Sequence, residues 1–132
     1  KRFGCDFPYH FFFFFFNKYV QQFIKEEGVP VKKGVYEILD YAKARNIKTA
    51  IATSTKRSIA EEYLKSTDIL DRVDHIVCGD EIIKSKPEPD IYLEAAYKIK
   101  IDIRDCLVIE DSNAGIVAGF TSGASCGCKN GV

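Results

Sequence analysis

Hydrophobic positions along this chain alternate between two spacings, one typical of amphipathic helices and one typical of buried strands. Between Lys18 and Glu27 the apolar residues recur at helical spacing, and Gly28 follows as a stop signal. Short aliphatic runs, such as Ile47 to Ala52 and Cys106 to Ile109, are typical of strands buried in a sheet. The pattern therefore predicts helices and strands in alternation.

The remaining elements continue this alternation at short intervals. Helices are expected at Gly34 to Arg45, Lys56 to Lys65, Pro89 to Lys98 and from Asn113, and further strands at Asp74 to Cys78 and Ala124 to Cys128. Alternating helices and strands joined by short loops favour a parallel sheet with helices on both faces. We therefore predict an α/β fold.

Composition restricts the classes of protein and partner. The 132 residues suit about one domain, and 19 basic residues balance 19 acidic ones, so no charge surplus indicates binding to nucleic acid or to a membrane. The run Phe11 to Phe16 is far shorter than the ~20 residues that span a bilayer, and no small-residue cleavage site follows it. The five cysteines are odd in number, and Cys78 and Cys106 lie in strand-like runs, as reduced core thiols do. We expect a cytoplasmic monomer.

Polar groups stand where three predicted strands or loops meet a helix. Thr53 and Ser54 precede a helix, where hydroxyls and unpaired N–H groups suit a phosphate, and Lys86 adds a positive charge. Glu110 and Asp111 supply the hard oxygen ligands that Mg²⁺ prefers. Because carboxyl ends of parallel strands meet at one edge of a sheet, these groups predict one metal and phosphate site for phosphoryl transfer.

Each group also has an ordinary structural interpretation. Thr53 and Ser54 could simply cap a helix, Lys86 could be a solvated surface charge, and an acidic pair before Ser112 could complement a helix dipole. Three independent caps are not expected to bring a hydroxyl, an ammonium and two carboxylates to three successive strand ends. The combination therefore favours the phosphoryl-transfer site.

Three segments carry a family resemblance. Ile51-Ala-Thr-Ser-Thr-Lys56, Ser85-Lys-Pro-Glu-Pro-Asp90 and Val108-Ile-Glu-Asp-Ser-Asn-Ala-Gly115 resemble the second, third and fourth motifs of the haloacid dehalogenase superfamily, and most closely its β-phosphoglucomutase and phosphoglycolate phosphatase-like branch. The resemblance implies a Rossmann-like three-layer core with a parallel sheet over residues 28–132. It also implies that residues 1–27 are the remnant of a helical cap, or a linker.

The resemblance also assigns roles by position. Thr53 resembles the phosphate-binding hydroxyl, Ser54 the residue whose amide joins it, and Lys86 the lysine that steadies phosphate and nucleophile. Asp111 resembles the Mg²⁺ ligand and Glu110 its companion, bound directly or through water. These roles imply a Mg²⁺-dependent phosphatase or phosphomutase that acts on a small phosphorylated metabolite, such as a sugar phosphate, through an aspartyl-phosphate intermediate.

One departure from the family pattern concerns the nucleophile. The family's first motif, Asp-x-Asp on an N-terminal strand, occurs nowhere in the chain, and Asp6 has an aromatic neighbour and proline where the motif needs a second carboxylate and glycine. In the family that strand is the centre of the sheet, in the order 5-4-1-2-3. We therefore expect the strands at Ile47 and Cys106 to face each other across a gap, and these 132 residues alone to be inactive.

Two other functions remain open. A catalytically inactive relative would bind phosphate or a protein partner without turnover. The missing first motif favours it, whereas the three intact motifs argue against it, because a chain without catalysis need not keep Lys86, Glu110 and Asp111 together. A receiver-like signalling domain shares the alternating architecture, but it would carry an acidic pair at the first strand and a lysine after the last. Here the acidic pair, Glu110 and Asp111, ends a late strand.

Overall fold

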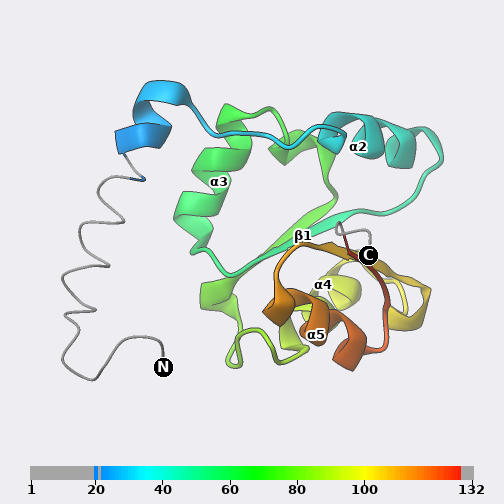
Figure 1. The fold of residues 1–132 in the computed structure, drawn as a ribbon. Coiled ribbons are helices and arrows are strands. Elements are labelled where there is room, and N and C mark those ends of the chain that lie inside the picture. Colours follow the sequence, from blue (N-terminus) through cyan, green and yellow to red (C-terminus); the bar gives the residue numbers. More distant parts are fainter. Residues whose placement is uncertain (1–19, 21, 129–132) are drawn as a thin grey trace, which may run out of the picture. The chain divides into compact units, whose positions relative to one another are not determined.

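The computed structural model of the protein describes Val20 and residues 22–128 (Figure 1). The chain divides into two units, residues 1–32 and 33–132. In the first unit the described backbone is helical up to residue 27. Gly28 then takes a φ of 81°, and its N–H donates to the Ile24 carbonyl at 2.9 Å, which ends the helix as predicted. Phe11 to Phe16, Asp6 and most of the expected cap remnant lie outside the described residues. The division of the chain at Gly28 stays a prediction.

The second unit contains the predicted alternation of helices and strands. Its elements are α2 (Val35–Ala44), β1 (Ala50–Thr53), α3 (Arg57–Ser66), η1 (Leu70–Arg72), β2 (His75–Cys78), η2 (Gly79–Glu81), α4 (Asp90–Ile99), η3 (Ile103–Asp105), β3 (Leu107–Glu110), α5 (Asn113–Ser122) and β4 (Ser125–Cys128). The expected helices and strands after Gly28 are all present, with ends shifted by three residues at most. None of the helices described is long and apolar enough to cross a membrane.

The strands form two parallel pairs rather than one continuous sheet. β1 pairs with β2, from Ala50 opposite His75 onward, and β3 pairs with β4, from Leu107 opposite Ser125 onward. Within the described residues neither β1 nor β3 has a strand on its other edge. This arrangement agrees with the expected α/β fold and with the expected gap between the strands at Ile47 and Cys106.

Helices cover both faces of the β1 and β2 pair. Ile76 and Cys78 of β2 pack with Ala60 of α3, whereas the intervening Val77 packs with Ile91 of α4. Because successive strand residues point to opposite faces, α3 and α4 lie on opposite sides of this sheet. The predicted three-layer architecture is therefore confirmed.

The larger hydrophobic cluster joins the two strand pairs. Tyr92 and Ala95 of α4 pack in one cluster with Val77, with Val108 of β3 and with Ala118 of α5. The other face of β3 is different, because the side chains of Leu107 and Ile109 are 65% and 60% exposed. The expectation that this aliphatic run is buried is wrong for that face, because no described element covers it.

Candidate functional site

Thr53 ends β1, and the turn that follows leads into α3. The Thr53 hydroxyl accepts a hydrogen bond from the Thr55 N–H at 3.2 Å, so its own proton can be donated elsewhere. Ser54 is exposed. Another residue caps the first turn of α3, because the Asp80 carboxylate accepts a hydrogen bond from the Arg57 N–H at 3.0 Å. Thr53 and Ser54 therefore do not act as the cap of α3.

The loop after β2 packs closely against this turn. The Gly79 N–H donates to the Thr55 carbonyl at 3.0 Å, and a Cβ on Gly79 would lie 2.8 Å from the backbone carbonyl carbon of Ser54. Backbone atoms cannot move away as a flexible side chain can, so the close approach requires glycine. Arg57 adds an ion pair to Glu81 at 2.7 Å. The loop that leads to Lys86 is thus fixed against the end of β1.

Lys86 joins the carboxyl ends of β1 and β3. Its ammonium forms an ion pair with Oε1 of Glu110, and it donates to the Ala52 carbonyl of β1 at 3.3 Å. The two paired side chains are only 11% and 12% exposed. Lys86 is therefore not the solvated surface charge of the ordinary interpretation. Because Thr53 follows Ala52 and Asp111 follows Glu110, the three motifs meet at this edge.

Glu110 accepts hydrogen bonds at both carboxylate oxygens. Oε1 accepts from Lys86 and from the Tyr92 hydroxyl at 2.7 Å, while Oε2 accepts from the N–H of Asp111 at 3.1 Å and from the N–H and hydroxyl of Ser112 at 3.2 and 2.9 Å. Burial alone would raise the pKa of Glu110, but the hydrogen bonds from Lys86, Tyr92 and Ser112 outweigh burial and lower this pKa to about 2. The carboxylate is therefore ionised at neutral pH.

Tyr92 is a member of this cluster that the sequence did not reveal. It lies in the first turn of α4 and is 7% exposed, and burial together with its bond to Glu110 raises the pKa of the phenol. Its place on the apolar face of a predicted helix indicates a core residue. The one indication that Tyr92 also has a polar contact is the general tendency of a buried phenol to find a hydrogen-bond partner.

Gly115 makes room for the Glu110 carboxylate at the start of α5. The Ser112 hydroxyl accepts from the Gly115 N–H at 3.1 Å, which confirms Ser112 as the predicted cap of α5. A Cβ on Gly115 would occupy the space of the Glu110 carboxyl group. The position of the Glu110 carboxylate, and with it the hydrogen bonds that this carboxylate accepts, therefore depends on glycine at residue 115.

Asp111 and Glu110 differ in how they could hold Mg²⁺. Glu110 already accepts five hydrogen bonds, whereas a carboxylate offers about four lone-pair sites, so direct coordination of Mg²⁺ by Glu110 would displace at least one of these bonds. Asp111 is exposed at the end of β3 and fits a direct ligand. The described residues contain no cluster of three or more His, Cys, Asp or Glu side chains arranged for a metal. The donor set therefore fits one side of a Mg²⁺ shell that waters and substrate oxygens would have to complete.

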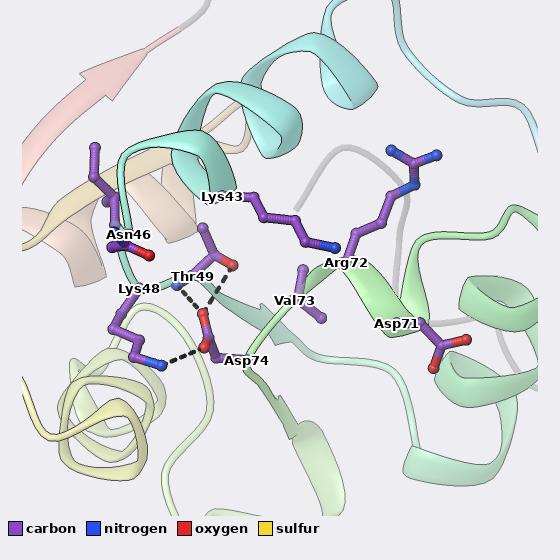
Figure 2. A pocket seen from close by; sticks show the side chains of 9 residues that line it. Lys43, Asn46, Lys48, Thr49, Asp71, Arg72, Val73 and Asp74 are labelled. Carbon is purple, nitrogen blue, oxygen red and sulfur yellow. Dashed lines mark hydrogen bonds and ion pairs between the residues drawn. The ribbon is translucent and has the colours of Figure 1, made fainter.

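A cavity of about 280 Å³ lies at the opposite edge of the β1 and β2 pair (Figure 2). Thr49 and Asp74, which directly precede β1 and β2, line it. Figure 2 shows the Asp74 carboxylate held by the Lys48 ammonium at 2.7 Å and by the Thr49 N–H at 2.9 Å. The cavity is therefore separate from the cluster around Lys86.

Comparison with known proteins finds one matching family and several similar proteins. Residues 7–128 match the haloacid dehalogenase-like hydrolase family. The phosphorylated carbohydrates phosphatase of Thermotoga maritima is 37% identical over 90 residues, which are 68% of this chain and 42% of that protein. The β-phosphoglucomutase of Clostridium difficile superposes with a TM-score of 0.66 at 29% identity, over 70% of this chain and 41% of that one. A variant of CbbY from Rhodobacter sphaeroides, in complex with xylulose 1,5-bisphosphate, superposes with a TM-score of 0.70 at 27% identity, over 76% and 46%.

The chain belongs to the haloacid dehalogenase-like hydrolase family. The relatives confirm the resemblance predicted from the three motifs, including that to β-phosphoglucomutase. The chain spans less than half of the length of each of the three relatives described.

Proposed function

We propose that the protein carrying this chain is a Mg²⁺-dependent phosphatase or phosphomutase that acts on a small phosphorylated metabolite through an aspartyl-phosphate intermediate. One observation carries the proposal: the Lys86 ammonium is held between the carboxyl ends of β1 and β3. Its two partners there, Ala52 and Glu110, directly precede Thr53 and Asp111 in the chain. A buried ammonium that is paired with one carboxylate, at the strand ends that carry Thr53 and Asp111, supports a site with the charges that phosphoryl transfer requires.

Thr53, Ser54 and Lys86 are the proposed phosphate-binding groups. The Thr53 hydroxyl can donate its proton to a phosphate oxygen because its oxygen already accepts from Thr55. The Ser54 N–H would bind a second oxygen at the same turn. Lys86 would place its positive charge toward the phosphate and the attacking carboxylate, which makes Lys86 and Thr53 the proposed catalytic residues of this chain.

Asp111 is the proposed direct Mg²⁺ ligand, and Glu110 its companion, bound directly or through water. Bound Mg²⁺ would offset the negative charge on the transferring phosphoryl group. Glu110 also keeps Lys86 in place, because the buried ion pair opposes movement of the ammonium. Asp111 and Lys86 thus have separate tasks, one toward the metal and one toward the phosphate.

The proposal requires a nucleophilic aspartate that these 132 residues do not supply in an Asp-x-Asp motif. A parallel strand placed between β1 and β3 would end beside Lys86, because Lys86 spans the carboxyl ends of those two strands. We propose that sequence outside these residues provides this strand and its aspartate. The 132 residues alone are then expected to give negligible turnover.

The names of the relatives support sugar phosphates as the first substrates to test. One relative is a phosphatase of phosphorylated carbohydrates, and the CbbY complex contains a sugar bisphosphate. We propose a cytoplasmic monomer whose partner is such a metabolite, without nucleic acid or membrane. The balanced charge of 19 basic and 19 acidic residues supports the part of this proposal that concerns nucleic acid and membranes.

Asp111→Asn in the full-length protein is expected to weaken Mg²⁺ binding about tenfold, because the carboxamide keeps one oxygen ligand but loses the charge. Calorimetric Mg²⁺ titration measures this directly, and kcat at limiting Mg²⁺ should fall with it. Asp105→Asn is the matched control, since Asp105 is exposed and precedes the opposite end of β3. Equal Mg²⁺ affinity of the two variants would exclude Asp111 as a ligand.

The second candidate function is a catalytically inactive relative that binds phosphate or a protein partner. The absence of an Asp-x-Asp motif from the sequence favours it. Assays of the full-length protein with p-nitrophenyl phosphate and a set of sugar phosphates separate the two functions. Phosphate binding without turnover would favour the inactive relative.

A further inference from the structure

Tyr92 belongs to the cluster of Lys86 and Glu110, yet the proposed chemistry gives it no task. Its side chain is 7% exposed and packs in the core with Val77 and Val108. Its hydroxyl donates to Oε1 of Glu110 at 2.7 Å, and the Lys86 ammonium lies 5.0 Å from the centre of its ring. One side chain thus contacts both members of the buried ion pair.

The two ends of the Glu110 carboxylate are held differently. Oε2 is fixed by Asp111 and Ser112, which are its own neighbours in the chain. Oε1 is held by Lys86 and Tyr92, which are distant in the chain. These two contacts matter because the last torsion of a glutamate side chain is broad and does not by itself fix the position of Oε1. Of these groups, Lys86 has a flexible four-carbon stem on a loop, whereas Tyr92 is packed on a helix in the core. Tyr92 is therefore the more rigid reference for the position of Oε1.

We propose that Tyr92 is a positioning residue. Its hydroxyl fixes Oε1 of Glu110, and through that oxygen it holds the Lys86 ammonium between the carboxyl ends of β1 and β3. This inference rests on the proposed function, because phosphoryl transfer is what needs the ammonium there. The competing explanation is ordinary packing, in which Glu110 is only the nearest acceptor for a buried phenol.

Tyr92→Phe tests the inference in the full-length protein. Phenylalanine keeps the packing and the ring that faces Lys86, and it removes only the hydroxyl. We expect kcat for p-nitrophenyl phosphate with Mg²⁺ to fall about tenfold, the scale of one hydrogen bond to a charged group, with a smaller change in KM. The matched control is Tyr97→Phe on the same helix, where the side chain is 74% exposed. An unchanged kcat in Tyr92→Phe would overturn the inference.

A second comparison shows whether Tyr92 acts through Lys86. In a Lys86→Met background, which keeps the stem and removes the ammonium, Tyr92→Phe is expected to cause no further loss of kcat. Two changes that act through one group are not additive, whereas independent changes are. A full further loss in this background would show that Tyr92 acts through another group, and the inference would be wrong.

The inference and the proposed function can fail separately. If the wild-type protein turns over neither p-nitrophenyl phosphate nor sugar phosphates, the proposed function fails. Calorimetric binding of inorganic phosphate in the presence of Mg²⁺ then decides the role of Tyr92. About tenfold weaker binding by Tyr92→Phe than by wild type supports the inference. Equal affinities, or no phosphate binding by wild type, overturn it.

Discussion

Replacing Lys86 with alanine in the full-length protein is expected to lower kcat about a hundredfold or more, because a preorganised positive charge facing the phosphate is lost. The same change should lower the free energy of unfolding by about 3 kcal/mol. Removing one partner from a buried ion pair leaves the other charge without compensation, and the two side chains here are 11% and 12% exposed. Turnover of p-nitrophenyl phosphate and urea unfolding measure the two effects.

A compensating variant separates catalysis from stability at Lys86. Adding Glu110→Gln to Lys86→Ala removes the isolated buried charge, so part of the unfolding free energy should return while kcat stays low. Lys84→Ala is the matched control, because Lys84 is exposed two residues earlier in the same loop. If the double variant regained wild-type kcat, Lys86 would have no role beyond stability.

Gly115→Ala is expected to produce the second large effect, and with a sign opposite to that of helix propensity. Alanine in a helix is favoured over glycine by about 1 kcal/mol. Here the new Cβ would displace the Glu110 carboxylate from Lys86, Tyr92 and Ser112. We expect a net loss of about 3 kcal/mol in the free energy of unfolding and about a hundredfold lower kcat. Urea unfolding and turnover of the full-length protein measure both.

The control for Gly115 lies one turn further along α5. A Cβ on Gly119 would meet the Cys126 sulfur at 3.2 Å and a Val108 methyl at 3.3 Å, and these side-chain atoms can shift by small amounts. Gly119→Ala gains the same helix propensity, and this gain offsets the cost of the small side-chain shifts. The free energy of unfolding of this variant should therefore change little. Similar results for the two variants would mean that the Glu110 carboxylate does not occupy the space beside Gly115.

The order of the elements could be predicted from sequence because each strand is a short aliphatic run between polar turns. The ends of β1 and β3 were placed within three residues, which was enough to locate Thr53 and Glu110 at strand ends. Pairing of the strands depends on contacts that no local pattern encodes. The gap between β1 and β3 was expected only from the family resemblance, and the exposed face of Leu107 and Ile109 was not expected.

The chemistry of the site was predicted as a set of residue types and not as a set of bonds. Lys86 and Glu110 were assigned to phosphate and metal, but 24 residues separate them and no spacing indicates their ion pair. Tyr92 and Asp80 were missed for the same reason. Tyr92 satisfies the pattern of a core residue, and Asp80 lies 23 residues from the helix turn that it caps. Such partners become visible only when the chain is folded.

The geometry of the site depends on how the two halves of the fold, one around β1 and β2 and one around β3 and β4, pack against each other. β1 pairs with β2 and β3 with β4, so each ladder closes between consecutive strands of the chain. The bond from Lys86 to Ala52 and its ion pair with Glu110 instead cross from one pair to the other. A small opening between the halves would break these contacts while both ladders stayed intact. The Lys86 ammonium therefore reports on the docking of the two halves, whereas backbone amide protection in the strands reports on each half alone.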